Sequence, residues 1–145
     1  MKSKATGQIR LTLASRQENA ALAGLAVRGI CSGRTWTAVD VYQIELCVVE
    51  AVQNAICHAY GGDGGREVEV MIAEGPGRIE FHVSDTGKPM AAWPEETCLE
   101  FDPQDISRLP ERGRGLCLIR TIMDEVRYGS RGGRNTLTMV RRMPA

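Results

Sequence analysis

Residues 45–60 read ELCVVEAVQNAICHAY, a largely apolar stretch in which two polar side chains, those of Glu50 and Asn54, stand four positions apart. On a helix this spacing places both side chains one turn apart on the same face. Buried without partners, a carboxylate and a carboxamide would be costly. A solvated helix face would also explain the pair, but Leu46 and Cys47 share that face. We therefore expect the face to be partly covered, for example by a ligand.

The two side chains of this pair suit different chemistry. A carboxylate such as Glu50 can act as a general base toward a hydroxyl group. The amide oxygen of Asn54 is a hard ligand of the kind that Mg²⁺ prefers. The helix that carries them is predicted over residues 37–60, and the glycine-rich run 61–65 ends it.

Two glycine-containing segments follow this helix. The first, Asp85-Thr-Gly87, comes directly after a predicted strand. One interpretation is an ordinary turn, which needs no ligand. In the other, the Asp85 carboxylate accepts a hydrogen bond from an adenine amino group, and Gly87 lets the base approach the backbone.

The second segment, Gly113-Arg-Gly115-Leu116, opens a predicted helix over residues 116–125. Glycines let backbone N–H groups converge on an anion, and a helix N-terminus adds a positive dipole. The same segment would also serve as the end of a flexible loop. No Gly-x-x-x-x-Gly-Lys-Ser/Thr motif occurs, so a Walker-type ATPase is not supported, and Leu118 breaks a Gly-x-Gly-x-x-Gly pattern.

Strands and helices are expected on both sides of these segments. Ser15 and Glu18 predict a capping box at the start of the first helix. Residues 86–112 carry four prolines and no sustained period, which is typical of a functional lid or of disorder. The other expected elements are a helix at 15–29 and strands at 8–13, 67–72, 78–83, 126–128 and 136–140. Together they predict one domain over residues 1–145, an α/β (α+β) two-layer sandwich with helices on one face of a mixed, mostly antiparallel sheet.

The composition is that of an ordinary globular protein. Hydrophobic residues make up 43% and charged residues 25%, and 18 basic residues balance 18 acidic ones. This balance argues against a dedicated nucleic-acid binder. No apolar run approaches the roughly 20 residues that span a bilayer, so no membrane association is expected. The five cysteines include no Cys-x-x-Cys pair, and no secretory signal is evident, so we expect reduced core thiols in a cytoplasmic protein.

The order and spacing of the three segments resemble the ATP-binding superfamily of gyrase, histidine kinases and mismatch-repair ATPases, known as the Bergerat fold. The motifs that carry the resemblance are Glu50-x-x-x-Asn54 on a helix, Asp85-x-Gly87 after a strand and Gly113-x-Gly115-Leu116 opening a helix. The match is closer to the short bacterial anti-sigma-factor serine/threonine kinases, and it covers roughly residues 8–142. The resemblance implies a histidine-kinase-like ATPase domain that binds ATP and Mg²⁺.

It also implies a role for each matching residue. Glu50 would be the general base that deprotonates a Ser or Thr hydroxyl of a protein substrate. Asn54 would hold Mg²⁺ against the phosphates of ATP. Asp85 would bind the adenine amino group, and Gly87 would line the base.

The phosphates would be held through backbone N–H groups around Gly113, Gly115 and Leu116. Arg114 is added as a phosphate contact because of its charge rather than because of the motif. Thr136, on the last strand, would lie near the adenine side.

The mobile lid of the family corresponds to about residues 88–112. Many members of the superfamily carry Asp-x-Gly-x-Gly, whereas Pro89 stands at the fifth position here. The pair Lys88-Pro89 resembles a variant seen in some kinases of this subgroup.

Partners follow from the same resemblance. The family phosphorylates a small anti-sigma antagonist of the sulfate-transporter/anti-sigma (STAS) type and holds an RNA polymerase sigma factor inactive. A phosphate adds a charge of about −1.5 to −2 at a docking surface, so it can dissolve one complex and free the kinase for the other. The small-residue helix at 15–29 and the resemblance favour a homodimer. Two alternatives stay open: a non-catalytic nucleotide-binding switch module, and a detached ATPase domain of a larger signalling complex.

Overall fold

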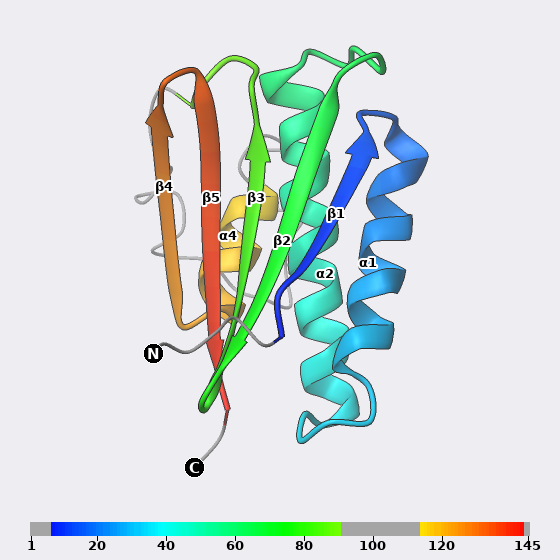
Figure 1. Ribbon diagram of the computed structural model, residues 1–145, viewed down its shortest axis with the longest axis vertical. Helices are drawn as coiled ribbons and strands as arrows, with labels where there is room; N and C mark the ends of the chain where they lie inside the picture. Colours follow the sequence, from blue (N-terminus) through cyan, green and yellow to red (C-terminus); the bar gives the residue numbers. More distant parts are fainter. Residues whose placement is uncertain (1–6, 91–113, 144–145) are drawn as a thin grey trace.

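The computed structural model describes residues 7–90 and 114–143 of the chain. They form two layers, a five-stranded sheet and a layer of helices on one face of it (Figure 1). The strands are β1 (Ile9–Ala14), β2 (Glu67–Gly75), β3 (Arg78–Asp85), β4 (Glu125–Arg131) and β5 (Arg134–Arg142). The helices are α1 (Gln17–Cys31), α2 (Ala38–Asn54), the π-helical turn η1 (Ala55–Ala59) and α4 (Arg114–Ile122). None of these helices is long and apolar enough to cross a membrane.

The strands follow one another across the sheet in the order β1-β2-β3-β5-β4. The predicted two-layer class with helices on one face is confirmed. Among the described strands every pairing is antiparallel, so the parallel pair that a mixed sheet would contain does not occur. The reason is the position of β5, which enters between β3 and β4 and runs opposite to both (Figure 1).

The strands β2, β3, β4 and β5 are longer than predicted, whereas β1 has the predicted length and lies one residue further along the chain. The turn expected over residues 129–135 shrinks to Gly132 and Gly133, with φ angles of 59° and 79°. Positive φ at both central residues matches the twist of the flanking strands, and glycine reaches it without strain. β4 and β5 therefore pair from Arg131 and Arg134 beside the turn to Glu125 and Val140.

The two long helices begin differently from the prediction. The expected capping box at Ser15 is wrong: Ser15 donates to the carbonyl oxygen of Asp63 and accepts from the Arg66 N–H at 3.0 Å, so its hydroxyl ties α1 to the loop before β2. Arg16 occupies the N-cap and supplies no side-chain bond. A complete capping box lies instead at α2, where Thr37 and Asp40 bond each other's backbone N–H groups.

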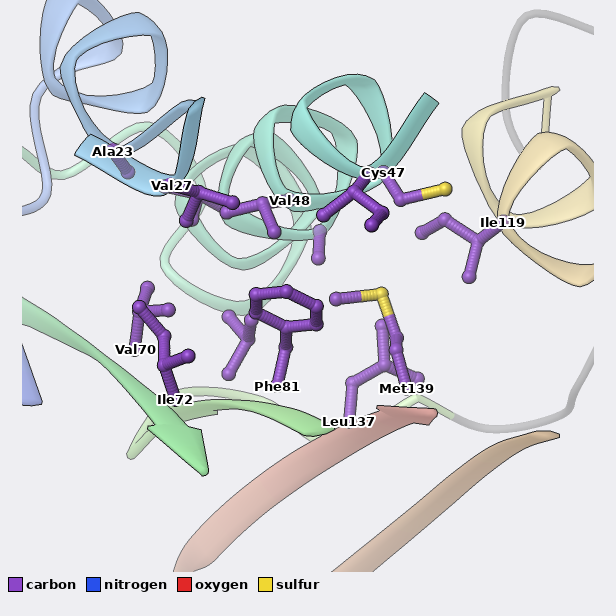
Figure 2. Close-up of a cluster of buried hydrophobic side chains, with 14 of the residues drawn as sticks. Ala23, Val27, Cys47, Val48, Val70, Ile72, Phe81, Ile119, Leu137 and Met139 are labelled. Atoms are coloured by element: carbon purple, nitrogen blue, oxygen red, sulfur yellow. The ribbon is translucent and has the colours of Figure 1, made fainter. Parts of the chain in front are cut away.

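The hydrophobic core lies between the two layers (Figure 2). Phe81 on β3 and Met139 on β5 are fully buried and point toward the helices. Val48 on α2 and Ile119 on α4 meet them and are also fully buried. The long helix at 37–60 and the helix after Gly113 thus each bury an apolar face, as their patterns predicted.

Because side chains alternate along a strand, the residues that face the helices can be followed to the ends of β3 and β5. Counting by two from Phe81 along β3 leads to Asp85, and counting by two from Met139 along β5 leads to Asn135. Asp85 and Asn135 are directly opposite each other in the β3–β5 register. Two polar side chains therefore reach the helix side of the sheet at the same point.

The cysteines agree only partly with the expectation of reduced core thiols. Cys31 and Cys47 are free and fully buried, and burial raises the pKa of Cys47 to about 12. Cys57 is free but exposed, because η1 turns it toward solvent. Cys117 is disulfide-bonded, contrary to the expectation. Cys98 lies outside the described residues.

Candidate functional site

A pocket lies where the end of α2 and η1 meet the ends of β3, β4 and β5. Its apolar walls include Val83, Leu137 and the ring of Tyr128, and its polar side chains include Asn54 and Asp85. Asn54 comes from the predicted polar pair and Asp85 from the first glycine-containing segment. The structure therefore brings these two sequence-predicted residues together in one cavity.

Asp85 is held in this pocket by two donors on one oxygen. Its side chain is buried, and Oδ1 accepts the N–H of Gly87 at 3.0 Å and the amide Nδ2 of Asn135 at 2.7 Å. Within residues 7–90 and 114–143, no donor bonds Oδ2. Asp85 Oδ2 is therefore available to accept a hydrogen bond from a molecule in the pocket.

Asn135 is a site residue that the sequence-based reasoning missed. Its side chain is 1% exposed, and Nδ2 also donates to the carbonyl oxygen of Gly87 at 3.0 Å. The hydroxyl of Ser130 donates to Asn135 Oδ1 at 2.7 Å. The signal that could have found it was the parity of β5, because Asn135 shares the inward face with Leu137.

Thr136 was predicted near the adenine side, but the structure does not bring it to this pocket. Its hydroxyl bonds that of Ser84 at 2.9 Å on the opposite face of the sheet. There it lines a shallow hollow together with Arg127 and Arg134. A one-residue step along a strand reverses the face, which is why Thr136 and Asn135 point in opposite directions.

Gly87 sits where no side chain fits. A Cβ on Gly87 would lie 2.3 Å from the backbone oxygen of Ala59 in η1. The next residue continues this contact, because the Lys88 N–H donates to the same oxygen at 2.8 Å. The Tyr60 hydroxyl accepts the Thr86 N–H at 2.9 Å. The glycine thus lets the turn after β3 pack directly on the end of the helix, whatever it does for a ligand.

Glu50 borders the pocket rather than lining it. Burial raises the pKa of its carboxyl above the ordinary value. A Cβ on Gly115 would lie 2.2 Å from Glu50 Oε1, so the backbone at the start of α4 passes directly over this carboxylate. The prediction that the helix face around Glu50 is partly covered is therefore confirmed, and the covering element is α4.

The second glycine-containing segment is described only from its second residue. Gly113 and the side chain of Arg114 lie outside the described residues, as does nearly all of the predicted lid. Arg114 and Gly115 form the first turn of α4, whose backbone N–H groups have no partners inside the helix. Leu116 is 6% exposed and packs into the core, so only its backbone is free to meet a ligand.

The arrangement combines parts with distinct chemical capacities. The pocket offers an acceptor at Asp85 and a hard oxygen donor at Asn54, one helical turn from Glu50. Glu50 in turn touches the start of α4, where a helix dipole favours anions. A ligand with an aromatic amine at one end and anionic groups at the other would match this sequence of features.

Known proteins share this chain's sequence pattern. Residues 13–141 match the family described as "Histidine kinase-like ATPase domain". The serine-protein kinase RsbW of Listeria monocytogenes serovar 1/2a (strain ATCC BAA-679 / EGD-e) is 32% identical over 126 residues, covering 83% of this chain and 78% of that protein. The RsbW serine-protein kinase of Bacillus licheniformis is 31% identical over 126 residues, covering 86% and 79%.

Solved structures share the fold. The RsbU and RsbW domains of a Mycobacterium tuberculosis protein superpose with a TM-score of 0.67 at 22% identity, covering 97% of this chain but only 34% of that one. A chain of the SiaB-SiaC complex from Pseudomonas aeruginosa gives a TM-score of 0.64 at 13% identity, covering 91% and 88%. At these identities the likeness concerns the fold alone.

Proposed function

Because the chain belongs to the histidine kinase-like ATPase family, where its curated relatives include RsbW serine-protein kinases, we propose that it is an ATP-dependent serine/threonine protein kinase. The observation that carries the proposal is the meeting of Asn54 and Asp85 in one pocket, with Glu50 against the start of α4 at its border. We further propose that the kinase is an anti-sigma factor.

The base of ATP would occupy the apolar end of the pocket. Asp85 Oδ2 would accept a hydrogen bond from the adenine amino group, while Oδ1 keeps its two protein donors. Val83, Leu137 and Tyr128 would contact the faces and edges of the ring. A guanine would place a carbonyl oxygen, an acceptor, against the same carboxylate, so the pocket favours adenine.

The phosphates would point from the base toward α4. Backbone N–H groups of its first turn and the helix dipole favour an anion there, and Arg114 would add its charge. Among the described residues no three His, Cys, Asp or Glu side chains gather into a metal cluster. Asn54 Oδ1 would hold a Mg²⁺ ion that arrives with the nucleotide, and the ion would supply charge neutralisation.

Glu50 would act as the general base. Its carboxylate would take the proton from a Ser or Thr hydroxyl as that oxygen bonds to the γ-phosphorus and the bond to the β–γ bridging oxygen breaks, which leaves ADP. Because burial raises the pKa of the Glu50 carboxyl, the carboxylate is a stronger proton acceptor than an exposed one. Because Gly115 has no side chain, the first turn of α4, where the phosphates would bind, can lie against this carboxylate.

The protein substrate would be a STAS-type antagonist, and the second partner an RNA polymerase sigma factor. Phosphorylation adds negative charge to the antagonist at its docking surface and thereby separates it from the kinase. The freed kinase would then hold the sigma factor inactive. Both partners act in the cytoplasm, where we place this chain, and we expect it to work as a homodimer.

The test combines the protein with radiolabelled ATP, Mg²⁺ and each STAS-domain protein encoded near its gene. We expect label on a Ser or Thr of one of them. Glu50→Gln should lower this transfer by roughly 10²- to 10⁴-fold while ATP affinity stays within about threefold. Asp85→Asn should instead weaken ATP binding by roughly 10- to 100-fold in calorimetry, because a charge-assisted acceptor is lost.

Two results would separate the alternatives. Unchanged phosphotransfer by Glu50→Gln would show that Glu50 is not the general base. Wild-type protein that binds ATP but labels none of the candidate proteins would favour a non-catalytic nucleotide-binding switch module.

A further inference from the structure

We propose that Asn135 is the positioning residue that makes the nucleotide pocket selective for adenine over guanine. The proposal rests on the proposed function, because it requires that a purine nucleotide binds beside Asp85. Asn135 itself need not touch the nucleotide. It acts through the Asp85 carboxylate, which it bonds at 2.7 Å.

The orientation of the Asn135 amide is determined by its surroundings. Asp85 Oδ1 and the carbonyl oxygen of Gly87 only accept hydrogen bonds, so the group that faces both of them has to be the NH₂. The amide oxygen then faces Ser130, whose hydroxyl donates to it at 2.7 Å. With its side chain 1% exposed, Asn135 has one orientation in which every polar atom is paired.

This arrangement fixes which oxygen of Asp85 can meet a ligand. Two donors, the Gly87 N–H and Asn135 Nδ2, converge on Oδ1. Rotation of the carboxylate would break both bonds at once, so Oδ2 is held toward the pocket. Neither donor bonds Oδ2, and it therefore presents a pure acceptor to the ligand.

Selectivity follows from the difference between the two purines at this position. Adenine carries an amino donor where guanine carries a carbonyl acceptor. A carboxylate oxygen that is fixed in the pocket repels the carbonyl oxygen of guanine. A carboxylate that can turn away from the base no longer does so, and guanine can then bind. Loss of the Asn135 bonds should therefore reduce discrimination more than it reduces overall nucleotide binding.

The sharpest variant is Asn135→Asp, which keeps the size and shape of the side chain. With both carboxyls ionised, at about pH 8, the two groups repel each other and Asp85 loses its fixed position. With one shared proton, at about pH 5.5, the protonated carboxyl that this substitution introduces can donate to Asp85 Oδ1 as the amide does. His58 and Lys88 also line the pocket, so wild type is measured at each pH as the reference.

The experiment measures the affinities of ATP and GTP by calorimetry with Mg²⁺ at both pH values, and the readout is their ratio. Both nucleotides have the same phosphates, so phosphate titration cancels in the ratio. We expect the ATP preference of Asn135→Asp to fall by about tenfold at pH 8 and to recover at pH 5.5, while the wild-type ratio changes little. Thr136→Val is the matched control, because its side chain points to the opposite face of the sheet.

Melting temperatures of all variants separate this role from a structural one. A lower melting temperature with an unchanged ATP/GTP ratio in Asn135→Asp would overturn the inference, as would a lowered ratio that does not recover at pH 5.5. Failure of the wild-type protein to bind ATP at all would instead refute the proposed function on which the inference stands.

Discussion

The backbone of Gly115 lies directly on the carboxylate of Glu50, so that a Cβ at this position would come within 2.2 Å of Glu50 Oε1 and 3.4 Å of Glu50 Cβ. The residue proposed as a base and the helix proposed to hold phosphate are therefore in contact. Only glycine at position 115 leaves the Glu50 carboxylate in this position, with or without a bound nucleotide.

A methyl group at position 115 should disable transfer through Glu50. In Gly115→Ala the obstructing atom is the tip of a side chain, which can turn away, so we expect the fold to persist. A displaced base should lower phosphotransfer by roughly 10- to 100-fold. Gly29→Ala in α1, where a Cβ meets nothing within 4 Å, is the control. Normal transfer by Gly115→Ala would contradict the coupling.

Glu50 also makes the stability of the protein depend on pH. Burial raises the pKa of its carboxyl, so the folded chain holds this proton more tightly than the unfolded chain, and stability falls as pH rises above the ordinary value of about 4.3. Glu50→Gln removes the loss of stability that comes from burying an ionised carboxylate. Urea denaturation should show the variant more stable than wild type near pH 7, with the difference fading toward about pH 4. An equal difference in stability between Glu50→Gln and wild type at both pH values would argue against burial as the cause. Glu18→Gln, at an exposed position in α1, serves as the control.

Gly87→Ala should destabilise the protein itself, before any effect on nucleotide binding. Its Cβ would lie 2.3 Å from a backbone oxygen of Ala59 and 2.8 Å from Tyr60 Cδ1, and backbone cannot move aside cheaply. We expect a loss of about 1–3 kcal/mol in the free energy of unfolding. Gly129→Ala in β4, with open space around the added methyl, should change it by less than about 0.5 kcal/mol. Equal losses in both variants would mean that the Ala59 contact is not the cause.

Arg141 joins three elements through one guanidinium. Its Nη2 donates to Asp40 Oδ1 at 2.6 Å at the start of α2, and its Nη1 donates to the carbonyl oxygen of Ile122 at 2.9 Å at the end of α4. Both ion-pair side chains are mostly buried, at 16% and 14% exposed. Arg141→Met should therefore cost about 1–3 kcal/mol of unfolding free energy in urea titrations.

The ion pair of Arg28 and Glu45, in which only the arginine is largely exposed, offers the comparison for the Arg141–Asp40 pair. The Arg28 side chain is 54% exposed, so Arg28→Met should cost less than about 1 kcal/mol. A double-mutant cycle of Arg141→Met with Asp40→Asn would isolate the pair itself. A coupling energy near zero would assign the loss to the Ile122 carbonyl instead.

Local patterns predicted the parts of the fold that depend on neighbours in the chain. Strict alternation identified β2 and β3, and the apolar period identified α2 and the helix after Gly113. The Glu50 and Asn54 pair was recognised for the same reason, because residues four positions apart lie on the same face of a helix. The apolar residues on that face correctly indicated that it is covered, but the covering element proved to be α4, which no local pattern named.

The missed features all depend on contacts between distant segments. Ser15 has the sequence of a helix cap, but a loop 48 residues away takes its hydroxyl. Thr136 was named from the family resemblance, and Asn135 was missed because its role depends on Asp85, which lies 50 residues away in the sequence and opposite it in the sheet. No local sequence pattern predicts that β5 lies between β3 and β4.

That insertion has a consequence for biosynthesis. The strand made last among those described takes an interior place in the sheet, so β3 offers an unpaired edge to its surroundings while β4 and β5 are still being made. Asp85 and Asn135 are 50 residues apart, and closing so long a loop slows pairing. A chain still emerging from the ribosome therefore carries a carboxylate without the amide that holds it. Until β5 is in place, the exposed edge of β3 is the part of the sheet that is open to aggregation.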